Sequence, residues 1–154
     1  IVDEKKDLNE ILQAKKYFEL IINNFPKTDY AEDSKYKLEY IIEIIASKEM
    51  YLARYYVQRE KWIPAINRYK NVINKYQTTI YVEEALHRLV EIHYIIGLEE
   101  EAKKYAVLLG YNYKSSEWYE ESYKVFNRDY EKISKRKKNK NKKTILEKLR
   151  SLIQ

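Results

Sequence analysis

The sequence of 154 residues contains no cysteine and only two glycines and two prolines. Without cysteine the chain can form no disulfide, no thiolate metal site and no thiol nucleophile. Closely spaced β-hairpins depend on glycine-containing turns, so the scarcity of glycine argues against an all-β fold. No apolar run approaches the roughly 20 residues that a membrane-spanning helix needs. Apolar residues still make up 45% of the chain, which excludes a disordered polypeptide and provides a core for one domain.

The charge is distributed unevenly along the chain. Residues 132–154 contain ten Lys and Arg and one acidic residue, so they carry +9, and residues 1–131 carry −3 of the formal total of +6. We therefore divide the chain into a mildly acidic body, residues 1–131, and a basic tail, residues 132–154. Because the chain begins at Ile1 without an initiator methionine or a signal peptide, we interpret it as a fragment or a mature product.

A short motif occurs three times in the body. Each copy has an aromatic residue, a polar turn, a Thr or Ser, and then an aromatic residue followed by two acids; the copies align without gaps at 23–34, 74–85 and 113–122. The Thr or Ser stands just before an expected helix, where its oxygen can accept a hydrogen bond from a free amide, and we predict this N-cap role for Thr28, Thr79 and Ser116. The acids then fall in the first helical turn, where the helix dipole favours negative charge.

The spacing of the copies predicts the fold. They are separated by 51 and then 37 residues, and a small residue recurs at the same offsets as Ala14, Ala65 and Ala102. The offset of 37 is close to the roughly 34-residue period of tetratricopeptide (TPR) helix pairs. The offset of 51 is explained by residues 30–59, which lack Gly and Pro and repeat apolar residues on one helical face. We therefore predict an all-α, TPR-like α-solenoid of antiparallel helix pairs with one overlong helix.

The same pattern gives the expected helices. Their predicted ranges are about 8–25 after an Asp7 cap, 30–59, 62–76, 80–96, 98–111 and 116–135, with a last amphipathic helix at 145–153 after Thr144. The residues 136–143 between them are too charged to pack. The apolar stripe of the last helix either docks on the body or binds a partner; its members are Ile145, Leu149, Leu152 and Ile153.

Nothing in the sequence indicates catalysis. His87 and His93 are six residues apart, so they do not share one face of a straight helix. Metal-protease, phosphate-loop, dinucleotide and nucleophile-elbow motifs do not occur. The carboxylates cluster in the first turns of helices, where capping explains them. We therefore expect a protein that is not an enzyme and has no cofactor or metal site.

The basic run at 132–143 has three interpretations. It is a solvated linker, a contact for anionic lipid headgroups or an acidic partner, or a site that neutralises nucleic-acid phosphates. The acidic body and the lack of aromatic residues within the run make nucleic acid the least favoured of the three.

One stretch is more specific than a general TPR pattern. Residues 49–70 read EMYLARYYVQREKWIPAINRYK, preceded by a Phe-Pro-Lys-Thr-Asp-Tyr turn from residue 25 and followed by Val-Glu-Glu-Ala-Leu from residue 82. This resembles the BamD (ComL) family, TPR lipoproteins of the β-barrel assembly machine in the outer membrane of Gram-negative bacteria. The resemblance covers about residues 10–120 and matches the carboxy-terminal half of the family. Gln77 replaces the usual proline after Tyr76, Glu60 replaces a small turn residue, commonly glycine, and the basic tail is not part of the common core.

The resemblance implies a non-enzymatic adaptor at the periplasmic face of the outer membrane, with a lipidated cysteine anchor outside this fragment. Its partners would be the POTRA region of a BamA-like barrel subunit, other assembly-machine lipoproteins and, through missing amino-terminal repeats, unfolded outer-membrane proteins. The key docking residue of the family is the arginine of an Asn-Arg pair, which Asn67 and Arg68 match; Arg59 and Tyr56 are weaker candidates. Since Arg68 precedes Tyr69, which the repeat pattern places in the core, we expect Arg68 to point away from the core.

Two other functions remain open from the sequence. One is a periplasmic TPR scaffold of the Tol–Pal coordinator type, which shares the turn motif but lacks the 49–70 stretch and the overlong helix. The other is a nucleic-acid-binding helical repeat that uses the basic tail.

Overall fold

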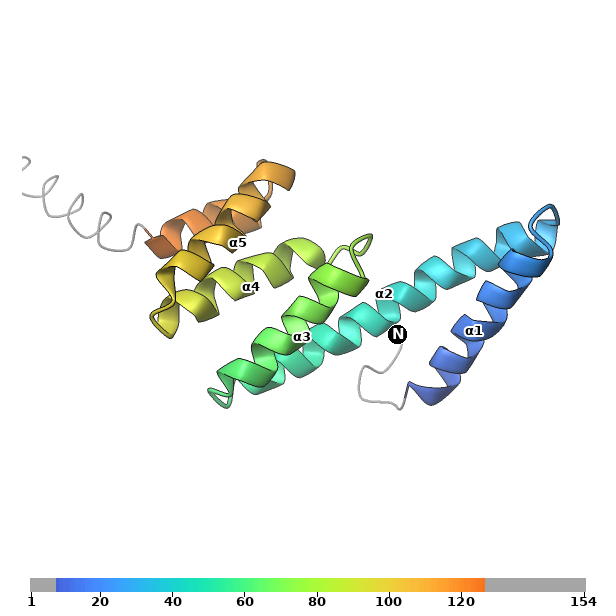
Figure 1. The fold of residues 1–154 in the computed structure, drawn as a ribbon, viewed down its shortest axis with the longest axis horizontal. Coiled ribbons are helices and arrows are strands. Elements are labelled where there is room, and N and C mark those ends of the chain that lie inside the picture. The colour runs from blue at the N-terminus through green and yellow to red at the C-terminus, as the bar shows by residue number, and fades with distance from the viewer. Residues whose placement is uncertain (1–7, 127–154) are drawn as a thin grey trace, which may run out of the picture.

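The computed structural model describes residues 8–126, and within that range the chain consists of helices joined by short turns, without a strand (Figure 1). Consecutive helices pack against one another along the chain. No helix in this range combines the length and the apolar character needed to cross a membrane. The helices are α1 (Asn9–Asn24), α2 (Asp29–Val57), α3 (Trp62–Lys75), α4 (Val82–Ile95) and α5 (Glu99–Asn112), followed by a helical segment from residue 117 to the end of the described range at 126.

The predicted fold class is confirmed, and each helix bound within the described range agrees to within two residues. The overlong helix is confirmed as α2, which is 29 residues long. In Figure 1 α1 lies along its amino-terminal half and α3 along its carboxy-terminal half. The predicted Asp7 cap, residues 127–135 of the sixth helix, and the segment 136–154 with its last helix lie outside the described residues.

Two of the three predicted N-caps are confirmed. The hydroxyl oxygen of Thr28 accepts a hydrogen bond from the amide of Ala31 at 3.3 Å, and that of Ser116 accepts one from the amide of Tyr119 at 3.2 Å. The cap predicted at Thr79 is wrong. Thr79 donates to the carbonyl of Tyr76 at 2.8 Å, as Thr28 does to that of Phe25, but α4 begins only at Val82, after Tyr81, too far along the chain for Thr79 to cap it.

The acids predicted for the first helical turns are confirmed except for the second acid of two pairs, Asp33 and Glu121. Asp29 and Glu32 lie in the first turn of α2, and Glu83 and Glu84 in that of α4. In the sixth helical segment, which begins at residue 117, Glu120 holds the fourth position, as Glu32 does in α2, and Glu121 lies one residue further on, as Asp33 does.

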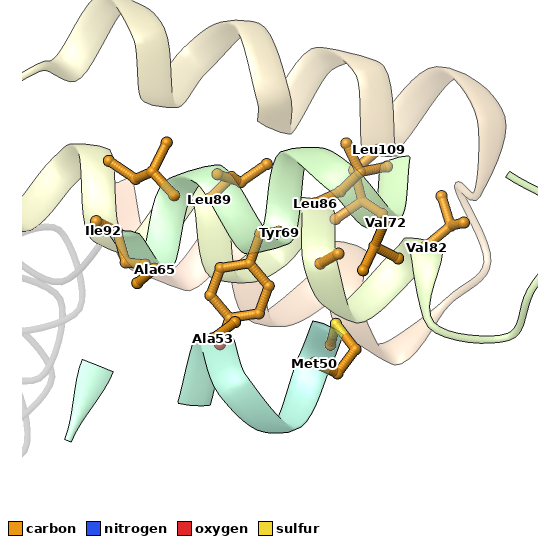
Figure 2. Packing of buried hydrophobic residues seen from close by; sticks show 12 residues of the cluster. Met50, Ala53, Ala65, Tyr69, Val72, Val82, Leu86, Leu89, Ile92 and Leu109 are labelled. Carbon is orange, nitrogen blue, oxygen red and sulfur yellow. The ribbon is translucent and has the colours of Figure 1, made fainter. Parts of the chain in front are cut away.

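The main core forms where α3 lies between α2 and α4 (Figure 2). Ala53 of α2, Ala65 and Tyr69 of α3, and Ala85 of α4 are all completely buried. The small side chains let the helix backbones approach, and the ring of Tyr69 fills the space that they leave, as the repeat pattern predicts for Ala65 and Tyr69. The third repeat alanine, Ala102, is also buried. Ala14 is only half-buried, because α1 packs on α2 alone and buries no residue completely.

The turn between α2 and α3 has a left-handed residue. Glu60 has φ of 55°, a conformation that is unfavourable for a side chain with a Cβ atom. The corresponding turn between α4 and α5 uses Gly97 at φ 82° instead. Glu60 therefore stands where the resemblance leads one to expect glycine, and the structure shows the physical reason for that preference.

We predict that Glu60→Gly raises the free energy of unfolding by roughly 1 kcal/mol, since glycine adopts the left-handed conformation without the steric cost. Urea denaturation of the two proteins measures the difference. Glu60→Ala keeps the Cβ atom and serves as the control; an equal gain in that variant would attribute the effect to the lost carboxylate rather than to the backbone.

The hydroxyl of Tyr69 is the one buried side-chain polar atom in residues 8–126 that has no hydrogen-bond partner. Burial raises the pKa of this hydroxyl to about 12. An unsatisfied buried hydroxyl has lost its hydration without gaining a bond, which costs about 1–3 kcal/mol.

We therefore predict that Tyr69→Phe leaves the free energy of unfolding unchanged or raises it by about 1 kcal/mol, whereas Tyr69→Ala lowers it by about 3–5 kcal/mol because it opens a cavity. Chemical denaturation compares the three proteins. A clear loss of stability in Tyr69→Phe would mean that the hydroxyl makes a stabilising hydrogen bond, contrary to this prediction.

Candidate partner-binding surface

The side chain of Arg68 extends from the middle of α3 towards α2. Its Nη1 atom donates to both carboxylate oxygens of Glu49, at 3.1 and 3.3 Å. Asn71, one turn further along α3, donates its side-chain amide to the same carboxylate at 3.1 Å. The Glu49 side chain is 14% exposed and that of Arg68 is 37% exposed. Glu49 therefore holds the guanidinium group in a fixed direction, while the Arg68 side chain as a whole stays partly exposed.

A second arginine shows what is unusual about Arg68. Arg54 of α2 uses its Nε and Nη2 atoms together to donate to the two oxygens of Glu84, at 3.1 and 2.6 Å. In Arg68 these same two atoms have no hydrogen-bond partner within residues 8–126. The Nε and Nη2 atoms together form an edge of the guanidinium group that can bind a carboxylate through two parallel hydrogen bonds. Arg68 thus presents an unused, oriented carboxylate-binding edge.

The neighbours of Arg68 agree with the sequence expectation. Tyr69 is completely buried, whereas Arg68 remains partly exposed, so the two side chains point in different directions. Asn67 is exposed on the same helix, next to Arg68. The side-chain amide of Asn67 and the charged side chain of Arg68 therefore lie next to each other on α3.

The two weaker candidates, Arg59 and Tyr56, lie at or near the turn between α2 and α3. The guanidinium of Arg59, in the turn, stacks on the ring of Tyr55 at 3.7 Å from its centroid. Tyr56 is half-buried and packs against the main core. Arg68 instead contacts Glu49, ten residues before Arg59 in the sequence. No contact within residues 8–126 joins Arg59 to Arg68, so the structure does not gather the four candidates into one cluster.

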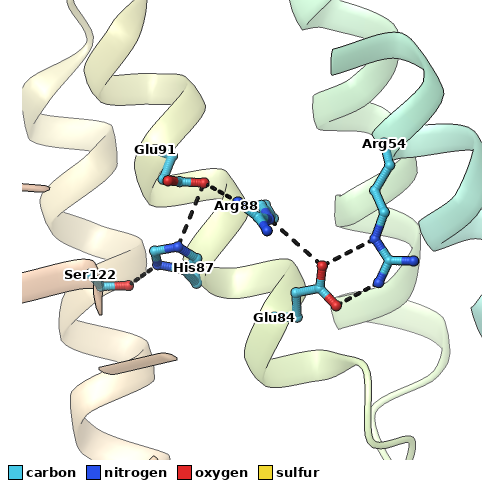
Figure 3. A network of polar contacts seen from close by, with 6 residues as sticks. All are labelled: Arg54, Glu84, His87, Arg88, Glu91 and Ser122. Atoms are coloured by element: carbon cyan, nitrogen blue, oxygen red, sulfur yellow. Dashed lines mark hydrogen bonds and ion pairs between the residues drawn. The ribbon is translucent and has the colours of Figure 1, made fainter. Parts of the chain in front are cut away.

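A polar network between the helices was not predicted from the sequence (Figure 3). Glu84 of α4 receives the two hydrogen bonds of Arg54 and lies 3.6 Å from the Nε atom of Arg88, one turn along the same helix. Arg88 in turn donates from Nη1 to Glu91 at 2.7 Å. The only signal in the sequence is the spacing of Glu84, Arg88 and Glu91 at one helical turn; that Arg54 joins them is decided by packing.

The network continues through His87 to the sixth helical segment. The Nε2 atom of His87 lies 3.5 Å from Glu91, and its Nδ1 atom lies 2.8 Å from the hydroxyl of Ser122 (Figure 3). The ring also lies against Trp118, with centroids 5.3 Å apart. This geometry fits the tautomer that donates from Nε2 to Glu91 and accepts from Ser122. His87 therefore connects α4 to the segment 117–126.

His93 likewise has a structural contact. It is buried, and its Nδ1 atom donates to the carbonyl of Leu89 at 2.7 Å. Within residues 8–126 no group of three or more His, Asp or Glu side chains is arranged to hold a metal ion.

Comparisons with known proteins agree on one family. A family model described as an outer membrane lipoprotein, YfiO, matches residues 1–108. An outer membrane protein assembly factor BamD from Rickettsia prowazekii is 43% identical over 125 residues, which are 81% of this chain and 50% of that protein. BamD from Caulobacter vibrioides is 39% identical over 127 residues, 82% of this chain and 42% of that protein. The chain spans about half the length of these curated relatives.

The carboxylate of Glu91 gives the network a pH dependence. Burial opposes its ionisation, but hydrogen bonds from His87 and Arg88 outweigh this and lower the pKa from 4.5 to about 2. A carboxyl group with a lowered pKa contributes stability above its unfolded value, and that stability is lost as the pH falls towards the folded value.

We predict that the stability of the protein decreases between about pH 4.5 and pH 2 more steeply than that of the Glu91→Gln variant, which has no carboxylate to protonate. Urea midpoints measured from pH 6 to pH 3 compare the two. Glu120→Gln, at an exposed position of the sixth helical segment, is the control and should follow the unmodified protein. Parallel curves for the protein and Glu91→Gln would contradict the assignment.

Proposed function

The chain belongs to the BamD family of outer membrane protein assembly factors, and we propose that it acts in that assembly as a non-enzymatic adaptor. In this proposal it works at the periplasmic face of the outer membrane. There it docks the periplasmic POTRA region of a BamA-like barrel subunit. A stack of helix pairs suits this role, because it presents continuous surfaces to other proteins.

The observation that carries the docking proposal is the state of Arg68. Its Nη1 atom is held by Glu49, and its Nε and Nη2 atoms have no partner within residues 8–126. An arginine that is already oriented loses less side-chain entropy when a carboxylate of another protein binds it. We therefore assign Arg68 as the main contact for an acidic residue of the barrel subunit, with Asn67 as a second hydrogen-bonding group beside it.

Arg59 and Tyr56 have a smaller part in this proposal. The stacking of Arg59 on Tyr55 makes a flat cationic surface at the α2–α3 turn, suited to the rim of an interface. Tyr56 supports the turn from the core side. Recognition of unfolded outer-membrane proteins belongs, on this proposal, to the part of the family that the chain does not cover, and contact with anionic lipid belongs to residues 132–143.

The histidines support a binding role rather than catalysis. Both are buried, and each is bonded to a neighbouring group that explains its position: Ser122 and Glu91 for His87, and the Leu89 carbonyl for His93. Neither ring is presented to a substrate.

We predict that Arg68→Glu weakens binding to the purified POTRA region by at least about thirtyfold, because it replaces the attractive charge with a repulsive one at a specific contact. Isothermal titration calorimetry measures the affinity. Arg68→Ala, which avoids repulsion with Glu49, should lose about tenfold or more.

Lys27→Glu, an exposed charge reversal in the α1–α2 turn, is the matched control and should leave the affinity unchanged. Unchanged affinity in both Arg68 variants, with thermal unfolding similar to the unmodified protein, would refute the docking role of Arg68.

A further inference from the structure

The length of α2 separates the two helices that pack on it, α1 and α3. Because α1 lies along one half of the helix and α3 along the other, a groove of about 520 Å³ remains between them. We call this the α1–α3 groove. Its apolar lining comes from two helices and the end of α3, and consists of Leu12 of α1, Ile42 and Ile45 of α2, and Tyr76 after the last residue of α3.

The groove is accessible rather than part of the closed core. Leu12 is 41% exposed, and α1 buries no residue completely. Ile42 is half-buried, and only Ile45 at the bottom is nearly inaccessible. Apolar side chains that are partly exposed together and surrounded by polar residues are typical of a protein-binding groove.

The border of the groove is positively charged. Lys16 of α1 and Lys75 of α3 line it, and neither forms an ion pair within residues 8–126. A third lysine in the lining, Lys15, is paired with Glu19 on the same helix. Two ammonium groups at an apolar groove are complementary to a segment that combines apolar and acidic side chains.

The groove continues the surface on which Arg68 lies. On α2 the lining residue Ile45 is one turn before Glu49, the residue that holds Arg68. On α3 the spacing of Arg68, Asn71 and Lys75 at i, i+3 and i+7 places them on one face. Seven helical residues span about 10 Å, which is also the length of three residues of an extended chain.

We propose that the α1–α3 groove binds an acidic and apolar segment of the same partner that docks on Arg68. One carboxylate of that segment pairs with Arg68, an apolar side chain about three residues away enters the groove against Leu12 and Ile42, and a second acid lies near Lys75. This inference rests on the proposed function and adds the chemistry of the partner: an extended segment with an acid and an apolar residue about three positions apart.

Charge argues against one other occupant of the groove, and the shape of the groove argues against a second. The basic tail of this chain, residues 132–154, carries a net +9 and would be repelled by Lys16 and Lys75. Anionic lipid would suit the lysines, but the groove lies between helices and does not form a flat basic face.

The experiment uses the whole chain and the same purified POTRA region as for Arg68. Leu12→Asp places a carboxylate in the apolar lining, and Lys75→Glu reverses the charge at its border. We expect each to weaken binding by about tenfold, measured by calorimetry. Leu20→Asp is the matched control: it introduces the same charge on the same helix at a position that is 52% exposed and does not line the groove, and it should leave the affinity unchanged.

The outcomes separate this inference from the proposed function. If the Arg68 variants lose affinity while Leu12→Asp and Lys75→Glu do not, the groove proposal is wrong and the docking role of Arg68 stands. If none of them loses affinity, both are wrong. Equal losses in Leu12→Asp and Leu20→Asp would overturn the groove as a specific site, and so would a dimer of the free chain, seen by analytical ultracentrifugation, that Leu12→Asp dissociates.

Thermal unfolding of the two variants shows whether a loss of affinity is due to a loss of structure. Since Leu12 and Lys75 are outside the closed core, thermal unfolding of both variants should match that of the unmodified protein. If Leu12→Asp nevertheless unfolds, Lys75→Glu decides the question alone, because it changes only an exposed charge.

Discussion

The close packing of α3 between α2 and α4 is the interaction on which the rest of the structure depends. Ala53, Ala65 and Ala85 are completely buried, so the three helix backbones approach closely, and Tyr69 fills the remaining space. Burial of a large side chain of this kind contributes roughly 1.5–3 kcal/mol. Because α3 is fixed on both sides, the residues on its outer face, Arg68 among them, have a defined position relative to α2.

The polar contacts refine this arrangement rather than create it. Arg54 joins α2 to α4 through Glu84, and His87 joins α4 to the segment 117–126 through Ser122. Partly buried charged side chains stabilise a fold only when each is paired with an opposite charge or a hydrogen-bonding group. Removal of one partner leaves an uncompensated charge in the protein. The network therefore favours one relative placement of the helix pairs over alternatives with a similar apolar core. A scaffold that presents surfaces to other proteins benefits from this rigidity.

The uneven repeat has a functional consequence. In a regular helix-pair array each helix is covered along its whole length by its neighbours, but α2 is 29 residues long while α1 and α3 are 16 and 14. The two shorter helices pack on different halves of α2, and the α1–α3 groove lies between them, one helical turn before Glu49, which contacts Arg68. The groove thus follows from the length of a single helix, whereas the orientation of Arg68 follows from the packing of α3 against α2.

The sequence by itself determined the helices, because apolar periodicity and Gly or Pro positions act locally. It determined the overlong helix, the caps at Thr28 and Ser116, the buried Tyr69 and, through the 49–70 stretch, the family. It failed at Thr79, since the residue at which a helix begins after a turn depends on how the next helix packs. Only the tertiary structure decided that Glu49 binds Arg68 and that Arg54 donates two hydrogen bonds to Glu84. Such pairings join residues 19 and 30 positions apart, and local periodicity carries no information on which side chains meet when two helices cross.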